Sequence, residues 1–288
     1  MEWGSAKKFV IVLLVILNVI LAGLNYKQRQ ENIMTSAQER AIFEVLSRNG
    51  ITLYTDLPTD ALSMTRLEME LPEYSKETLE RLFFGSEKTT VTVKDNQHVY
   101  RNAHASLTLD GAHGIFKKDS VPDGKRRMTK EDAQKEAQQF IDGTEHFFGI
   151  YDEPVVTEKE NGFRVDFFGL HKRENVFANY FSIFVTQGGI KRIEFEYCPV
   201  KGHSGEKKEL AFADEALLTF MREWKKNGDA EQATIHHIEL GYDKMERSTA
   251  SIDGAIYLDP CYRIYLVEEE EPYLVNGYTC QIYHKKKK

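Results

Sequence analysis

Ser204 lies between two glycines in the segment GHSGE, residues 202–206, a setting in which serine nucleophiles are often found. The nucleophile elbow of serine hydrolases has the spacing G-x-S-x-G, and position 206 of this chain is Glu instead of Gly. The segment also separates a predicted strand from a charged stretch. We therefore interpret residues 202–206 as a flexible loop and predict no catalytic serine.

Histidines and carboxylates that could hold a metal come closest together in HHIE, residues 236–239, within a predicted strand. Because side chains alternate along a strand, we expect His237 and Glu239 on one face and His236 on the other. A zinc protease carries H-E-x-x-H on a helix, and this pattern is absent. The other histidine candidates are spread over predicted hairpins, without a carboxylate at metal-ligand spacing: His98, His104 and His113. We predict no metal site.

Four consecutive glutamates stand before a proline in VEEEEPY, residues 267–273. Calcium favours such a density of oxygen ligands, but the D-x-D-x-D-G spacing of an EF-hand loop is missing. We interpret the segment as a solvated hairpin loop whose carboxylates could face a partner. No glycine-rich phosphate loop is found elsewhere, so we predict neither a catalytic residue nor a bound cofactor.

The elements expected to carry these residues are helices and short strands joined by turns. Helical spacing of apolar residues, with a capping residue before it or a glycine after it, predicts helices at 36–49, 75–84, about 129–147 and 212–226. Short strands with turn residues between them are predicted at 52–54, 66–71, 89–94, 98–101, 106–109, 162–170, 179–185, 189–197, 234–242, 261–268 and 273–283. This order predicts an α+β fold with antiparallel sheets and helices packed on one sheet face.

A turn-rich polar segment, VPDGKRR at residues 121–127, divides the chain. Before it we expect a membrane-proximal α+β region over residues 27–120. After it, residues 128–284 contain the same order twice, a helix followed by three strands. We place these two helix-plus-meander units at about 128–200 and 210–284.

A long apolar run, within KKFVIVLLVILNVILAGLNYKQRQ at residues 7–30, lies close to the start of the chain. As a helix, residues 9–26 would be roughly 27 Å long, close to the hydrocarbon thickness of a bilayer. The exit from the run lacks the A-x-A spacing of a cleavable signal. We predict a permanent anchor at 9–26, a cytoplasmic head at 1–8 and an extracytoplasmic main part.

Asn18 interrupts the apolar run near its middle, and an amide in hydrocarbon needs hydrogen-bond partners. One interpretation is that local water or headgroups satisfy it. The other is a hydrogen bond to a second membrane helix, with the small residues Ala22 and Gly23 on nearly the same face allowing close approach. In that case the anchor is also an interaction surface.

The composition limits the partners that the main part can bind. With 29% charged residues and a formal net charge of −7, the chain is too acidic to predict a nucleic-acid partner. The lysines at 285–288 are interpreted as a solvated tail. Three cysteines, Cys198, Cys261 and Cys280, show no zinc spacing; they permit one disulfide, and the sequence leaves the pair open.

Three segments resemble the YycI family, also called WalI. They are MEWGSAKK running directly into the apolar helix, QERAIFEVLSRNGITL followed by LPTDALSMTRLEME, and the closing YRIYLVEEEEPYLVNGYTCQIY. The closing segment is also similar, more loosely, to PepSY-like modules. The likeness is one of layout over nearly the whole chain, while the segment at 201–208 and the lysine tail match nothing in the family.

The resemblance implies a single-pass membrane protein without an active site. Members of the family associate with the related YycH protein and modulate the WalK (YycG) sensor histidine kinase, largely through transmembrane helices. It therefore implies partners in kinase membrane helices and a YycH-like protein, with Trp3, Asn18, Ala22 and Gly23 as candidate partner-binding residues. The alternative is an anchored extracytoplasmic cell-wall enzyme, a protease inhibitor or a ligand-sensing module.

Overall fold

A computed structural model describes residues 10–21, 34–58, 63–95, 97–120, 128–227, 232–245 and 254–284 of the chain. Residues 10–21 form a helix. Among the described helices, none combines the length and the apolar character needed to cross a bilayer. The predicted anchor at 9–26 extends past the described residues at both ends, and the predicted head at 1–8 and lysine tail at 285–288 lie outside them.

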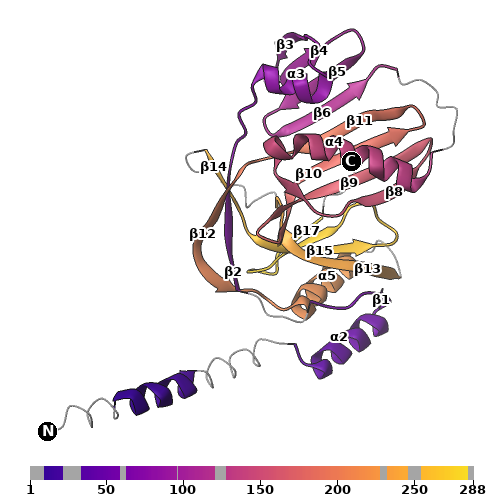
Figure 1. Cartoon of the computed structure of the whole chain (residues 1–288). Helices are drawn as coiled ribbons and strands as arrows, with labels where there is room; N and C mark the ends of the chain where they lie inside the picture. Colours follow the sequence, from indigo (N-terminus) through magenta and orange to yellow (C-terminus); the bar gives the residue numbers. More distant parts are fainter. Residues whose placement is uncertain are drawn as a thin grey trace. The chain divides into compact units, whose positions relative to one another are not determined.

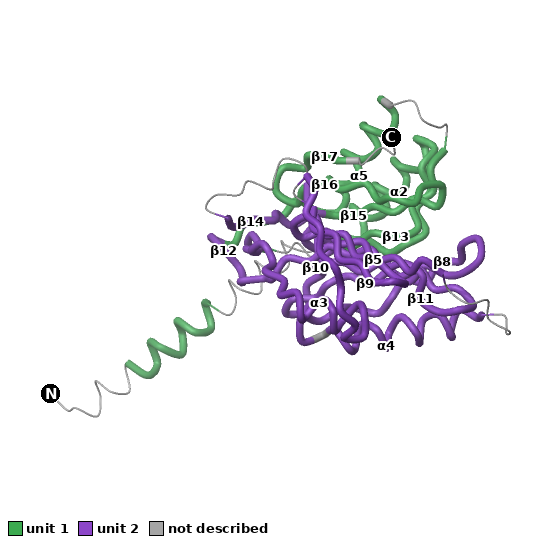
Figure 2. Tube along the Cα trace, turned by 90° about the horizontal axis from the view of Figure 1, so that it is seen from above, with its two compact units in different colours: residues 1–64, 207–239, 262–288 green, residues 65–206, 240–261 purple. Residues whose placement is uncertain are grey.

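The chain divides into two compact units, each assembled from separate segments (Figure 2). Unit 1 consists of residues 1–64, 207–239 and 262–288, and unit 2 of residues 65–206 and 240–261. The predicted helix-plus-meander unit at 128–200 lies wholly within unit 2. The one predicted at 210–284 contributes to both units.

Unit 2 is built on a large antiparallel sheet (Figure 1). Its strands, in spatial order from one edge, are β3 (Thr90–Lys94), β4 (Gln97–Arg101), β5 (Ala105–Asp110), β6 (His113–Lys118), β11 (Gly189–Glu196), β10 (Glu174–Thr186) and β9 (Gly162–His171). Both β7 (Ile150–Tyr151) and β8 (Val155–Lys159) pair with β9. A parallel contact of β10 with the end of β13 (Ala233–Tyr242) is a departure from the all-antiparallel expectation.

Two helices cover one face of this sheet: α3 (Lys76–Phe84) and α4 (Lys130–Phe148). Ser75 caps α3 by accepting from the Thr78 amide at 3.1 Å, and Thr129 accepts from the Asp132 amide at 3.2 Å before α4. Phenylalanines from the helices and the sheet form the core: Phe83 stacks on Phe195, with ring centroids 5.3 Å apart, and Phe195 stacks on Phe181 at 5.0 Å. The helix-covered face is therefore the buried face.

A second sheet in unit 2 has three strands in the order β12 (Val200–Glu209), β2 (Ser63–Glu70) and β14 (Ala255–Leu258). The predicted flexible loop at 202–206 is wrong, because these residues belong to β12. Gly202 and Gly205 adopt φ values of 146° and 81°, which side chains of other residues rarely tolerate. Pairing with β2 thus overrides a composition typical of loops.

Unit 1 contains α2 (Ser36–Arg48), β1 (Ile51–Leu53), α5 (Ala213–Asn227), β16 (Tyr273–Asn276), β17 (Ile282–His284) and most of β13 and of β15 (Pro260–Leu266). A capping box starts α2: Gln38 N–H donates to Thr35 Oγ1 at 3.3 Å, and Thr35 N–H donates to Gln38 Oε1 at 2.9 Å. Phe220 of α5 packs edge-on against Tyr273, with centroids 5.0 Å apart. β1 pairs with β13 in parallel.

The α+β prediction is confirmed, as are the helices predicted at 36–49, 75–84, about 129–147 and 212–226 to within a residue or two. The strand predicted at 273–283 is wrong. The Asn276 side chain accepts from the amides of Tyr278 and Thr279 at 2.8 and 3.0 Å, and this turn separates β16 from β17. Strands β6, β7, β8 and β14 were not predicted. Residues 121–127 and Asn96 lie outside the described residues.

Candidate functional site

Strand β11 carries alternating charged and apolar residues, and this alternation places its charges on the sheet face opposite α3 and α4. Ile193 and Phe195 are buried in the core. Arg192, Glu194 and Glu196 occupy the intervening positions and therefore point to the other face. Register extends this face across the sheet, since Glu194 stands opposite Ser182 of β10 and Ile115 of β6.

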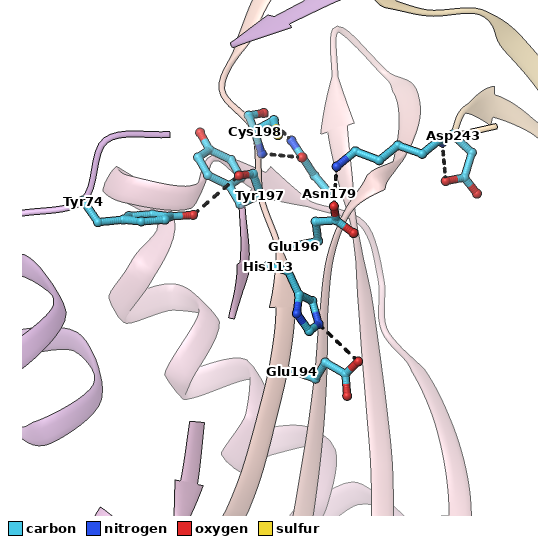
Figure 3. Close-up of polar contacts among 9 residues, drawn as sticks. Tyr74, His113, Asn179, Glu194, Glu196, Tyr197, Cys198 and Asp243 are labelled. Atoms are coloured by element: carbon cyan, nitrogen blue, oxygen red, sulfur yellow. Dashed lines mark hydrogen bonds and ion pairs between the residues drawn. The ribbon is translucent and has the colours of Figure 1, made fainter. Parts of the chain in front are cut away.

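The carboxylate of Glu194 is held between two basic side chains. Arg192 donates to Glu194 Oε2 at 2.6 Å. His113 Nε2 lies 3.4 Å from Glu194 Oε1 (Figure 3). The hydrogen bond with His113, followed by that with Arg192, lowers the pKa of Glu194 to about 2 against the opposing effect of burial. The same hydrogen bond raises the pKa of His113.

A second ion pair lies beside the first. Lys244 Nζ contacts Glu196 Oε1, and both side chains are only about a quarter exposed, at 26% and 25% (Figure 3). The backbone N–H of Lys244 donates to Asp243 Oδ1 at 2.7 Å. On β9, Arg164 pairs with Asp166 at 2.9 Å on the same face. We refer to these side chains as the charged row: His113, Arg164, Asp166, Arg192, Glu194, Glu196 and Lys244.

The end of β11 is fixed by Asn179, which is 4% exposed and lies in an irregular part of β10. Its amide accepts from the Cys198 N–H at 2.8 Å and donates to the Cys198 carbonyl at 2.9 Å (Figure 3). Gly169 on β9 makes room for this side chain, since a Cβ there would lie 3.0 Å from that of Asn179. Tyr74 adds a weaker contact, its hydroxyl donating to the Tyr197 carbonyl at 3.5 Å.

The thiol and phenol groups near the Asn179–Cys198 hydrogen bonds are shifted towards their neutral forms. Burial raises the pKa of the Cys198 thiol and of the Tyr197 phenol. Burial likewise raises the pKa of Tyr74. A thiol kept protonated is a poor nucleophile. The charged row, in contrast, presents acidic and basic side chains that are paired with one another, an arrangement suited to electrostatic recognition of a polar partner.

The HHIE segment differs from its prediction in one respect. His237 Nε2 lies 3.3 Å from Glu239 Oε1, as a shared face requires. His236 was expected on the other face, yet both imidazoles lie against Tyr265, with ring centroids 6.0 and 5.8 Å away. Ile238 is buried while His236 and His237 are exposed, so the strand departs from strict alternation here.

The other residues considered for chemistry are dispersed. Ser204 lies on β12, and His98 and His104 lie on β4 and before β5. In the acidic segment, Glu268 accepts from the Thr234 amide at 3.2 Å and Glu269 from the Tyr273 hydroxyl at 3.1 Å, both within unit 1. Across the described residues, no three His, Cys, Asp or Glu side chains are grouped so that they could hold a metal ion. Cys198 and Cys280 are free thiols.

Of the candidate partner-binding residues, only Asn18 is described. Its Nδ2 donates to the Leu14 carbonyl at 3.0 Å, one turn earlier in the same helix. Trp3, Ala22 and Gly23 lie outside the described residues. The charged row was not singled out from the sequence, although the alternation in GIKRIEFEY was a usable signal for it.

Fold and site together define an α+β protein in which a helix-covered antiparallel sheet presents paired charges on its second face. No protein-family model and no curated protein matches the chain. A solved structure of an uncharacterized protein from Eubacterium rectale is similar to it at a TM-score of 0.56 and 12% identity, covering 83% of this chain and 92% of the other. This likeness shows a shared fold.

Two further solved structures are similar at lower scores. The C-terminal domain of YpeB from Bacillus megaterium gives a TM-score of 0.40 at 11% identity, covering 73% of this chain and 97% of that domain. YycH from Bacillus subtilis gives 0.44 at 14% identity, covering 82% of this chain and 62% of YycH.

Proposed function

We propose that this chain is a membrane-anchored, non-enzymatic regulator of a sensor histidine kinase of the WalK (YycG) type. Its apolar N-terminal helix contacts membrane helices of the kinase, and its α+β part, outside the cytoplasm, associates with a YycH-like protein. The resemblance of its segments to the YycI family supports this proposal.

The proposal of a membrane anchor rests on the solvent exposure of apolar side chains in the helix at 10–21. Its large apolar side chains are between 48% and 66% exposed: Val10, Ile11, Val12, Leu13, Leu14, Val15, Ile16, Leu17, Val19, Ile20 and Leu21. Each apolar Å² in water costs roughly 25 cal/mol. A continuous apolar surface of this kind on all sides of a helix requires lipid or another apolar partner around it.

The amide of Asn18 provides the polar contact expected of such a helix. One of its N–H groups is satisfied by the Leu14 carbonyl, and none of the described residues donates to its Oδ1. That oxygen is an acceptor for a donor on a neighbouring helix, an interaction worth on the order of 1 kcal/mol in a membrane. A bias of roughly 1–2 kcal/mol changes the ratio of two kinase states about five- to thirtyfold.

The charged row supports a binding role for the α+β part. Its side chains are paired and lie on adjacent strands or, for Lys244, just after β13, while burial raises the pKa of the nearby thiol and phenol groups. Fixed charges on a rigid sheet favour selection of a partner with the complementary pattern. This is the surface that we assign to the YycH-like partner.

The test uses the full chain expressed in membranes together with the kinase, with co-purification and kinase output as readouts. In a matched variant, residues 9–26 are replaced by the spanning helix of an unrelated single-pass protein, which keeps the tether and removes the proposed contact. We expect the variant to reach the membrane and to lose both readouts. Full retention by the variant, or no association of the unchanged chain, would refute the membrane-helix mechanism.

A further inference from the structure

Two histidines and a glutamate meet in unit 2 where the two sheets come together. His171 ends β9 and Glu174 begins β10, and these two residues are partners across the hairpin. The turn between them consists of Lys172 and Arg173, both with positive φ, at 50° and 71°. The hairpin tip thus places two fixed cations directly beside His171.

His203 approaches this tip from β12 of the three-stranded sheet. Its ring lies 5.6 Å from the His171 ring, centroid to centroid, at an interplanar angle of 64°. Its Nε2 lies 3.2 Å from Glu174 Oε2, and its ring lies 6.4 Å from that of Tyr242. On the same strand, Lys201 is paired with Glu70 at 3.2 Å. The contact between the hairpin and β12 therefore depends on titratable groups.

His171 is placed where a positive charge is unfavourable. Its Nε2 is buried and has no hydrogen-bond partner among the described residues. Protonation would place a positive charge in a partly buried position, beside Lys172 and against His203, and the carboxylate of Glu174 opposes this effect only in part. Burial, Lys172 and His203, in that order, lower the pKa of His171.

We propose that the contact of His171 with His203 is an acid-sensitive joint that holds the β9–β10 hairpin tip against β12 at neutral pH and releases it on acidification. At neutral pH, His171 is uncharged and packs edge-on against His203, whose Nε2 lies 3.2 Å from Glu174 Oε2. When a proton binds His171, the imidazolium group lies beside Lys172 and against the His203 ring. The hairpin tip then moves away from β12, and the paired imidazoles gain access to water.

The direction of the pH dependence follows from the linkage between proton binding and the closed state. Because the pKa of His171 is lower in the folded state than in an open state, the open state binds more protons below about pH 6.5. The closed joint is therefore fully favoured above that pH and is weakened progressively as the pH falls through the lowered folded pKa. This window is close to physiological pH, where histidine is the usual switch.

The experiment measures amide hydrogen exchange of residues 169–176 and 201–205 in the full chain at about pH 7.5 and about pH 5, corrected for intrinsic exchange. We expect a severalfold loss of protection at the lower pH in the unchanged chain and no such loss in His171→Gln, which stays neutral. The matched control is His236→Gln, an exposed histidine of unit 1, which should behave as the unchanged chain does.

A second readout covers the case in which His171→Gln itself disturbs the tip. Imidazole NMR of the full chain should show His171 titrating below the ordinary value of about 6.5, and His203→Gln should move that midpoint upward. An equal loss of protection in the unchanged chain and in His171→Gln, or a His171 midpoint at or above 6.5, would overturn the proposal.

Discussion

Asn179 and Cys198 are joined by two hydrogen bonds, so that one side-chain amide completes both the donor and the acceptor of a backbone unit 19 residues away. The pairing is buried, and it closes β11 where the backbone ladder of the sheet has ended. The positions of Glu194 and Glu196 in the charged row depend on this closure.

Replacing Asn179 with Leu should destabilise the protein by about 3 kcal/mol, because it leaves the N–H and C=O of Cys198 buried without partners. Urea unfolding of the full chain in detergent measures the change. Thr92→Ala, at an exposed position of β3, serves as the control and should leave stability within about 0.5 kcal/mol. A loss below about 1 kcal/mol for Asn179→Leu would show that water replaces the amide.

Substitution by Ala should have opposite effects on stability at Gly114 and at Gly143. A Cβ at Gly114 would lie 2.2 Å from Cζ of Phe195, in the aromatic core, whereas nothing lies within 4 Å of one at Gly143 in α4. Gly114→Ala should therefore cost about 2 kcal/mol or more through overpacking. Gly143→Ala should stabilise the protein by about 1 kcal/mol through helix propensity. Thermal unfolding of the two variants side by side tests both signs; equal melting temperatures would contradict the packing.

The pair of Glu194 with His113 should give stability a defined pH dependence. Glu194 has a lowered pKa of about 2 in the folded state, so its contribution is complete above its unfolded value and is lost as the pH falls from about 4.5 towards 2. His113 has a raised pKa, so its contribution is complete below about 6.5 and is lost as the pH rises through the folded value.

Glu194→Gln should lower the NMR titration midpoint of His113 and weaken the acid dependence of unfolding between about pH 4.5 and 2. Glu160→Gln, at an exposed turn position, should change neither. If the midpoint of His113 is the same in Glu194→Gln as in the unchanged chain, the pair does not form in solution.

Asn18→Leu should preserve membrane insertion and weaken co-purification with the kinase about fivefold, the equivalent of an interhelical hydrogen bond of about 1 kcal/mol. Asn18→Gln keeps the amide and should retain part of the association. Association that is unchanged in Asn18→Leu would remove this residue from the mechanism and leave shape complementarity as the source of affinity.

Local patterns in the sequence predicted the helices α2 to α5. Several strands were not predicted, because their formation depends on pairing with distant segments of the chain. Helix α2 was predicted from the spacing of its apolar residues and from Gly50 after it, and the structure adds the capping box of Thr35 and Gln38 at its start. The prediction of a loop at GHSGE is wrong because glycine and serine do not favour a strand by themselves. Pairing with β2 holds the segment extended as part of β12. The prediction that His236 and His237 point to opposite faces is wrong because the side chains of this strand do not alternate strictly here.

The candidate site was harder to predict than the fold. Alternation in β11 indicates which charges share a face, but His113 and Lys244 join that face from about 80 residues before and 50 residues after it in the chain. Neither Asn179 with Cys198 nor His171 with His203 has a sequence signature, because each pair is brought together by tertiary contacts between segments far apart in the chain. Contacts of this kind are properties of the assembled sheet.

Unit 1 draws on three stretches of chain, the last of which begins at residue 262. During synthesis, its N-terminal stretch therefore emerges long before the strands that complete it. Ile42 and Leu46 of helix α2, which are buried in the folded chain, therefore stay exposed while more than half of the polypeptide has not yet been synthesised. Premature termination anywhere before β15 would consequently leave a product whose unit 1 has an incomplete apolar interior, a substrate for quality-control proteases.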